Sequence, residues 1–389
     1  MSFKQHFRHY FDANPRRLHF AAHSHHPWPD VTLAAQERCW LDGAELADRK
    51  WDRIFGEVYP ETQAAVARVL GLSQPAALAF GPNTHGFVLR LLSCLPSGRP
   101  PRVLTSGGEF HSFARQARRL EEDGLLHVTR VAVEPHADFS ERFASALVRD
   151  SYDLVFLSHV FFESGYAVPD LAKIVAAVED PATLVAVDGY HGFMAMPTDL
   201  KALEGRAFYM AGGYKYAMSG ENAVFLHAPP GFGARPRDTG WFAAFGKLAG
   251  GSDGTVAYGA DGARFLGATF DPVGLYRLRA VLNWLNELNV SVADIHAHAH
   301  ALQARFVEGL ERKSTRALNP AQLAVPIGEP SRGNFLTFRT PQAAAIRAAL
   351  LAREVTLDVR DDSLRVGFGL YHDEEDVARL CDTIAEALD

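Results

Sequence analysis

The sequence predicts an α/β protein whose large domain is built on a mainly parallel sheet, followed by a smaller α+β domain. Two observations support this prediction. Between residues 75 and 230, short apolar runs alternate with amphipathic segments, the pattern of strands joined by crossover helices. The last third instead shows two long helical patterns followed by a mixture of strands and helices. We therefore place the large domain at 15–265 and the small domain at 266–389, and we expect residues 1–14 to pack with the small domain.

The expected strands of the large domain are short apolar runs, at 102–105, 127–133, 154–158, 184–188 and 223–227. The expected helices between and before them lie at 87–95, 111–122, 139–148 and 170–178. In such a sheet the catalytic groups collect at the carboxyl ends of the strands. Ser158 with His159, Asp188 and the turn at 212–215 all fall at such ends, so we expect them to lie close together.

The small domain is expected to contain helices at 272–288, 292–313, 342–353 and 374–388, with strands at 334–339, 356–360 and 364–368. The segment 231–267 is rich in glycine, aspartate and aromatic residues and has no clear periodicity. We interpret it as a long ordered loop region.

Composition excludes several classes of protein. The 389 residues are 48% hydrophobic and 22% charged, with a net charge of −7, so nucleic acid is not expected as a partner. The N-terminus lacks the apolar core of a signal peptide and no stretch is as long as a membrane span, so we expect a cytoplasmic protein with no membrane partner. The cysteines, Cys39, Cys94 and Cys381, are too far apart to indicate a disulfide framework or a zinc site.

One lysine stands in unusual surroundings. Lys215 follows the apolar and aromatic run 208–214 and precedes Tyr216. Because such neighbours disfavour the ammonium form, the amine can become nucleophilic near neutral pH and form a Schiff base with an aldehyde. The alternative is a lysine whose stem packs on aromatic rings while its charged end reaches water.

Two further segments would complete a site for pyridoxal 5'-phosphate. Asp188 closes the apolar run 182–187, and a buried carboxylate there would suit a protonated pyridine nitrogen, with His191 beside the ring. Asn83 or Thr84 can cap a following helix whose free amides bind a phosphate. Each segment also has a purely structural interpretation, since Asp188 can cap the turn at 189 and Asn83 can be an ordinary helix cap.

Together these motifs resemble a known family. Asp-Gly-Tyr-His at 188–191 and Gly-Tyr-Lys-Tyr at 213–216 are similar to elements of the fold-type I, class V aminotransferase-like enzymes, and most of all to those of the kynureninases. Further similar segments are Glu-Phe at 109–110, Gly-Trp-Phe at 240–242, Asp-Val-Arg at 358–360 and the arginine motif at 365–371. The resemblance covers nearly the whole chain and implies an aspartate aminotransferase-like fold.

The resemblance also implies roles at the cofactor. Lys215 would form the Schiff base and shuttle the substrate's Cα proton, while Asp188 would keep the pyridine nitrogen charged. The remaining residues implied to contact the cofactor are Phe110 and His191 at the ring, and Asn83, Thr84, His85 and Tyr214 at the phosphate. Family active sites lie at a dimer interface, so we expect a homodimer in which Thr269 reaches the phosphate of the second subunit.

The implied substrate is a small-molecule α-amino acid. Arg365 matches the arginine that takes the substrate carboxylate, a task suited to a planar fork. Its alternative is a salt bridge to Asp361 or Asp362. The other implied substrate contacts are His23, Ser24 and Trp241.

Several substrate positions depart from the kynureninase pattern. The run Phe-His-Ser-Phe at 110–113 lacks the usual proline and aspartate, and Ala-Thr-Phe-Asp at 268–271 stands where a Ser-Asn-Pro stretch is expected. Phe161 and Phe162 occupy the place where many class V enzymes have an asparagine. Cofactor residues are thus kept while substrate residues have changed.

Three reactions compete under this resemblance. We expect hydrolytic Cβ–Cγ cleavage of an aromatic or bulky amino acid, with transamination as the alternative. Cysteine desulfuration is disfavoured, because it needs a nucleophilic cysteine on a C-terminal loop and 322–339 contains none.

Two other kinds of protein are alternatives to an enzyme of this family. A non-catalytic binding protein with this fold would not need both Lys215 and Arg365. A metalloprotein is suggested only by the histidines at 23–26 and by His296, His298 and His300. Since no zinc-protease pattern joins the helical histidines, we interpret that helix as a solvated face and expect no metal.

Overall fold

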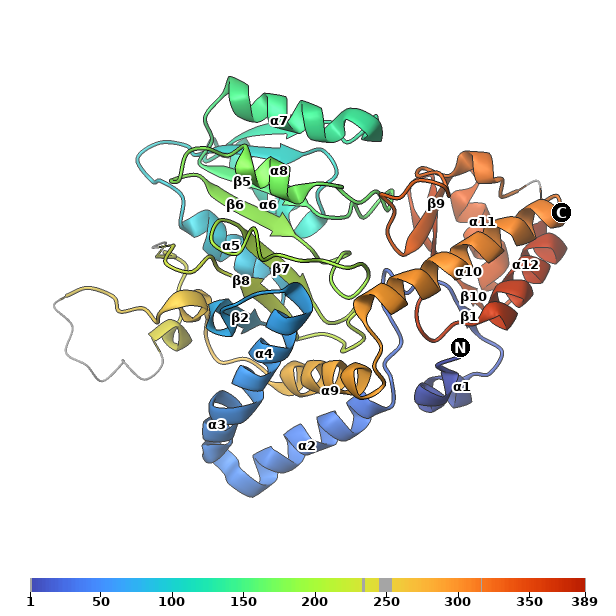
Figure 1. Cartoon of the computed structure of the whole chain (residues 1–389), viewed down its shortest axis with the longest axis horizontal. Helices are drawn as coiled ribbons and strands as arrows, with labels where there is room; N and C mark the ends of the chain where they lie inside the picture. Colours follow the sequence, from blue (N-terminus) through green and yellow to red (C-terminus); the bar gives the residue numbers. More distant parts are fainter. Residues whose placement is uncertain (1, 233–234, 245–253, 316, 389) are drawn as a thin grey trace.

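A seven-stranded sheet forms the centre of the larger of two regions that lie side by side in the computed structural model (Figure 1). The structure describes residues 2–232, 235–244, 254–315 and 317–388. Along the sheet the strands are ordered β2 (Leu78–Gly81), β8 (Val224–His227), β7 (Phe208–Gly212), β6 (Leu184–Asp188), β5 (Leu154–Ser158), β3 (Arg102–Ser106) and β4 (His127–Val131). Strand β8 runs antiparallel to its two neighbours, β2 and β7, and the other neighbouring strands pair in parallel. The prediction of an α/β fold with a mainly parallel sheet is confirmed.

Two of these strands were not predicted. The run that became β7 had been interpreted only as the surroundings of the lysine, and β2 is a four-residue strand. Their positions matter because Gly81 and Gly212 pair with the same residue of β8, Val224. The ends of β2 and β7 therefore lie at one edge of the sheet, together with the ends of β5 and β6, which pair through Ser158 and Asp188.

Helices cover the sheet on both sides. They are α2 (Val31–Leu46), α3 (Lys50–Arg53), α4 (Tyr59–Leu70), α5 (Thr84–Ser93), α6 (His111–Glu122), α7 (Phe139–Arg149), α8 (Leu171–Ala176) and α9 (Val273–Glu287). In Figure 1, α7 and α8 lie at the top of the large region, while α2, α3 and α9 lie at the bottom. Strands β5, β6, β7 and β8 are buried at every residue, as expected for central strands covered on both faces.

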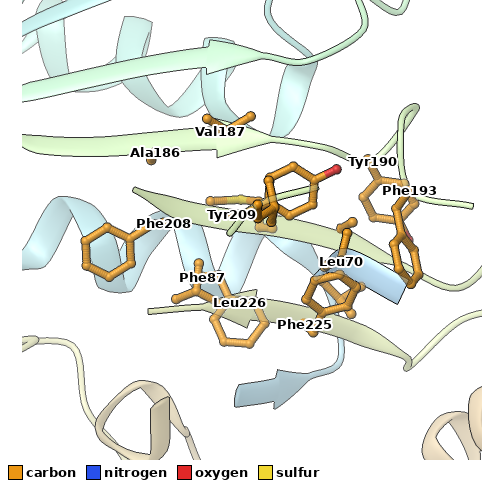
Figure 2. Close-up of a cluster of buried hydrophobic side chains, with 14 of the residues drawn as sticks. Leu70, Phe87, Ala186, Val187, Tyr190, Phe193, Phe208, Tyr209, Phe225 and Leu226 are labelled. Atoms are coloured by element: carbon orange, nitrogen blue, oxygen red, sulfur yellow. The ribbon is translucent and has the colours of Figure 1, made fainter. Parts of the chain in front are cut away.

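Aromatic side chains fill the core around β7 and β8. Figure 2 shows Phe208, Tyr209 and Phe225 from β7 and β8 packed with Phe87 of α5 and Phe193 of the turn after β6. The chain turns immediately after Asp188 at a glycine, where a Cβ atom would come within 1.9 Å of the Tyr209 ring. Only glycine allows this approach, so the packing of the core fixes the turn that carries Asp188.

The smaller region combines sheets and helices from both ends of the chain. Its elements are α1 (Arg8–Ala13), β1 (Leu18–His19), α10 (Val292–Arg312), β9 (Phe335–Arg339), α11 (Ala343–Leu351), β10 (Val355–Thr356), β11 (Asp358–Arg360), β12 (Ser363–Gly367) and α12 (Glu374–Leu388). The strands β11, β12 and β9 form an antiparallel sheet, and β1 pairs in parallel with β10. Both termini lie at this end of the molecule (Figure 1).

The two hydrophobic cores meet along α10. Leu275 and Val281 of α9 belong to the larger core, although α9 follows residue 266, and so does Phe7 near the N-terminus. The smaller core includes Phe306 of α10 and also Leu18 of β1, near the start of the sequence. No helix in the described ranges is long and apolar enough to cross a membrane.

The predicted loop region 231–267 lies partly outside the described residues, at 233–234 and 245–253. Its described parts contain two short 3-10 turns, Trp241–Ala244 and Asp261–Phe265. They lie on the side of the large region that faces away from the small one (Figure 1).

Candidate active site

Lys215 is buried at the edge of the sheet, with only 4% of its surface exposed. Its Nζ lies 2.7 Å from Nε2 of His191 and 4.8 and 5.1 Å from the ring centres of Tyr190 and Phe110. Burial lowers the pKa of Lys215 to about 7. The interpretation in which the charged end reaches water is therefore wrong, and the amine is available as a nucleophile near neutral pH.

Asp188 ends β6 directly beside this lysine. One carboxylate oxygen accepts a hydrogen bond from the backbone N–H of Tyr190 at 2.9 Å, which is the turn-capping role weighed from the sequence. Burial raises the pKa of Asp188, and the positive charge of Lys215 acts in the opposite direction. Because the cap uses only one oxygen, the carboxylate can also pair with a cation at this edge.

Two buried imidazoles near Asp188 have ring nitrogens without a hydrogen-bond partner among the described residues. They are Nδ1 of His191, next to Lys215, and Nδ1 of His159, which follows β5. A buried polar atom left without a partner costs about 1–3 kcal/mol. Burial, followed by the charge of Lys215, holds the pKa of His191 well below its usual value, so the ring is neutral and can donate and accept hydrogen bonds. These unpaired atoms fit a polar aromatic group such as pyridoxal 5'-phosphate.

The residues expected at the phosphate lie around the start of α5. Asn83 caps this helix, its side chain accepting a hydrogen bond from the backbone N–H of Gly86 at 2.9 Å. Thr84 is buried and His85 is exposed. Tyr214 is half-buried beside Lys215, with the His25 ring stacked on it at 5.2 Å. The shared pairing of β2 and β7 with β8 brings this helix start to the same edge as the lysine.

Phe110 stands at the start of α6 and faces the lysine. Its ring meets Phe162 edge to face at 5.3 Å, and Lys215 Nζ is 5.1 Å from its centre. The residue before α6 is thus placed where it can cover an aromatic ring held by Lys215, as the resemblance implies.

Arg365 of β12 enters the same site from the small region. It is 3% exposed, and it donates hydrogen bonds to the backbone oxygen of Phe162 and to Oδ2 of Asp358. The alternative considered for Arg365, a salt bridge to Asp361 or Asp362, is not what the structure shows, because residues 358 and 365 face each other across the β11–β12 hairpin. The Nε atom of Arg365 is buried without a partner in the described part of the chain, so one donor remains for a carboxylate.

His23 completes the wall opposite Lys215. It is fully buried, stacks on Phe335 at 4.5 Å and places Nε2 3.7 Å from Oδ2 of Asp358. Burial lowers the pKa of His23 to about 3, so the imidazole is neutral. For Asp358, burial acts to raise the pKa, but His23 and Arg365 together bring it well below its usual range. Ser24 lies beside this cluster, half-exposed.

Two predicted residues lie elsewhere in the single chain. Trp241 is 44% exposed and sits on Phe242, which packs with Trp51 of α3. Thr269 is exposed in the same part of the molecule, close to the Phe242 and Phe270 contact. Neither position joins the Lys215 cluster in this chain.

Some residues of the site were missed or given no role. Asp358 was only part of a motif, although a hairpin between the expected strands at 356–360 and 364–368 would have set it opposite Arg365. His159 was expected at a strand end together with Ser158, but it was given no role. Phe335 gave no signal, because an aromatic residue in a strand is common in cores.

The helical histidines are not a solvated face. His296 lies 2.8 Å from the side-chain oxygen of Asn334, His298 contacts the backbone of His372, and His300 contacts Arg332. All three are half-buried where α10 passes the small region, and this corrects the interpretation from the sequence. Within the described residues there is no cluster of three potential metal ligands.

A buried lysine, a strand-end aspartate and an arginine from a second region define a pyridoxal phosphate enzyme of fold type I. The chain belongs to the class V aminotransferase family, whose sequence model, "Aminotransferase class-V", matches residues 50–380. Pyridoxal 5'-phosphate is the cofactor of this family, and the unpaired buried atoms described above fit it.

Known proteins similar to this chain include a cysteine desulfurase and a kynureninase. A probable cysteine desulfurase of Vibrio cholerae is 24% identical over 302 residues, which are 74% of this chain and 71% of that protein. A kynureninase of Deinococcus radiodurans is 26% identical over 363 residues, covering 90% of this chain and 82% of that protein. The apo structure of a cysteine desulfurase from Thermococcus onnurineus has the same fold, with a TM-score of 0.82, 16% identity and coverage of 100% of this chain and 98% of that one.

Proposed function

We propose that this protein binds an aromatic or otherwise bulky α-amino acid and hydrolyses its Cβ–Cγ bond, as a kynureninase does. The observation that carries the proposal is one buried cluster in which the Lys215 amine and the Arg365 guanidinium share aromatic walls. Phe110 and Phe162 contact each other on one side, and Phe335 lies beside His23 and His191 on the other. A planar side chain suits such walls better than a small polar one.

The residues around Lys215 would serve the cofactor. When bound, pyridoxal phosphate supplies an electron-withdrawing ring that takes up charge from the reacting carbon. Lys215, with a pKa of about 7, can bind the aldehyde and then carry a proton to or from the substrate. Asp188 would pair with the ring nitrogen, Phe110 would cover the ring, and the start of α5 at Thr84 would hold the phosphate.

The residues around Arg365 would serve the substrate. The guanidinium is already held by the Phe162 carbonyl and by Asp358. A carboxylate can therefore bind without the entropic cost of orienting this side chain. The neutral ring of His23 lies next to it and has an Nδ1 atom without a partner among the described residues. This atom is a candidate contact for a polar group of the substrate, as is the Ser24 hydroxyl beside it.

Cysteine desulfuration remains the less favoured reaction, although relatives carry that name. Its nucleophile would have to be one of three cysteines. Cys381 is buried in α12 against Phe306, and Cys39 lies on α2. Cys94 follows α5, and its thiol donates a hydrogen bond to the Arg90 carbonyl. Burial raises the pKa of all three thiols, which suits structural rather than reactive cysteines.

The first experiment is the absorption spectrum of the purified protein with added pyridoxal phosphate, before and after borohydride. We expect a visible band that borohydride removes, that is lost in Lys215→Ala, and that is kept in the matched control Lys173→Ala, whose lysine is exposed on α8. Release of an aromatic amine and alanine from kynurenine would then support the hydrolase. A keto-acid-dependent reaction would instead establish the aminotransferase, and a band without turnover of any amino acid would establish a binding protein.

We also propose that two copies of the chain share their sites. Trp241 and Thr269 are exposed in the single chain, so a second copy could contact them. Mixing Lys215→Ala with Thr269→Ala protein tests this, because mixed dimers would regain one site with neither substitution. A monomer in sedimentation at working concentration would contradict the proposal.

A further inference from the structure

A buried carboxyl group lies next to the site without any role in the proposed chemistry. Glu109 is 5% exposed and immediately precedes Phe110. Its carboxylate accepts hydrogen bonds from the Ser106 hydroxyl, from the Ser158 hydroxyl at 2.7 Å and from the Ser158 backbone N–H at 3.2 Å. Glu109 therefore ties the segment that carries Phe110 to the ends of β3 and β5.

The carboxyl group of Glu109 lies on the same face of the sheet as Asp188. Ser158 and Asp188 are paired residues of the adjacent strands β5 and β6, so their side chains leave the sheet on the same face. Glu109 bonds to this Ser158 side chain and lies on that face too. Among the described groups on β3, β5 and β6, Asp188 is the charged one that acts on Glu109, and Lys215 acts in turn on Asp188.

The surroundings of Glu109 leave its charge sensitive to pH. Burial raises the pKa of Glu109 to about 7, the two serine hydroxyls act to lower it, and the charge of Asp188 acts to raise it. Near neutral pH the carboxyl group of Glu109 can thus gain or lose its charge.

We propose that Glu109 is a positioning residue of the cofactor site, which anchors the Phe110 segment to the end of β5 and whose negative charge acts through Asp188 on the cofactor. The proposal rests on the proposed use of Lys215 and Asp188 with pyridoxal phosphate. An ionised Glu109 stabilises positive charge on the cofactor and its lysine, whereas a protonated Glu109 does so less. The proton affinity of the bound cofactor therefore depends on this second carboxyl group.

The test compares two buried glutamates. Glu204 also accepts three hydrogen bonds, from the Ser73 hydroxyl and from the N–H groups of Ser73 and Gln74, but it contacts His227 at the opposite edge of the sheet. With pyridoxal phosphate bound, we expect Glu109→Gln to lower the pH midpoint of the visible band by about one unit. Glu204→Gln should leave that midpoint unchanged. Equal midpoints in wild type and Glu109→Gln would overturn the proposal.

A second measurement uses the protein without cofactor. Infrared difference spectra should show a carboxyl group that titrates near neutral pH in wild type and that is missing in Glu109→Gln. Ser158→Ala removes a donor to the ionised form, so this titration should move to higher pH. A wild-type spectrum without such a group would refute the charge assigned to Glu109, whether or not the protein ever binds pyridoxal phosphate.

Discussion

Replacing Lys215 with methionine should stabilise the cofactor-free protein, and by an amount that depends on pH. The pKa of this amine is about 7 in the folded protein against 10.5 in an ordinary lysine. Between these values the unfolded chain holds a proton that the folded chain has released, so wild-type stability rises with pH across this window. Methionine has a similar length and no charge to bury.

The size of the effect follows from the difference of about 3.5 units. At about 1.4 kcal/mol per unit, the buried amine costs roughly 5 kcal/mol at pH 6 and roughly 2 kcal/mol at pH 9. The advantage of Lys215→Met should therefore shrink by about 3 kcal/mol between these two pH values. Groups that titrate equally in both proteins cancel in this comparison.

Denaturant unfolding of the two apoproteins at several pH values measures this difference. Lys173→Met is the matched control, because its ammonium group lies on the exposed face of α8, and it should show no comparable trend. A stability difference between Lys215→Met and wild type that stays constant from pH 6 to 9 would show that the folded protein does not depress the pKa of this amine.

Three further predictions concern other parts of the site. Arg365→Lys loses the planar fork, so amino-acid affinity should fall about a hundredfold in titrations of the cofactor spectrum, and unchanged affinity would remove Arg365 from the carboxylate role. Asp188→Asn should keep the fold but release pyridoxal phosphate on dialysis faster than wild type, since the positive ring nitrogen loses its partner; equal retention would contradict that pairing. Asn83→Ala removes the hydrogen bond to Gly86 and should cost about 1 kcal/mol in thermal unfolding, together with weaker cofactor binding. Loss of stability without any change in cofactor affinity would leave Asn83 as an ordinary cap.

The strands and helices with strong periodicity could be predicted from the sequence. Helix α6 has the predicted bounds because its pattern is amphipathic, and strands β5 and β6 have them because each is an apolar run that ends at a polar residue. Strand β2 has only four residues, and β7 ends in glycine instead of a polar residue, so neither was given bounds. Pairing with β8 from a distant part of the chain makes β2 a strand.

Site residues could be predicted where the residue type and its sequence neighbours indicate the chemistry. They were harder to predict where the role depends on a hydrogen-bond partner that is distant in the sequence. Lys215 and Asp188 could be chosen because a buried charge at a strand end is unusual. The alternative partners considered for Arg365 were its sequence neighbours 361 and 362, but these lie in the hairpin turn while residue 358 lies across it. The histidines of α10 looked solvated because their partners, such as Asn334, are supplied by the small region.

The pairing of β1 with β10 joins the two ends of the chain, and it has a consequence for biosynthesis. His23, which follows β1, and Arg365 of β12 face the same carboxylate of Asp358. Until β10, β11 and β12 have been synthesised, the large sheet can already exist, but β1 has no partner and the substrate wall is open. The substrate wall should therefore close only after these strands have emerged from the ribosome, and blocking the pairing of β1 with β10 should disturb that step more than an insertion in the exposed loops of the large sheet.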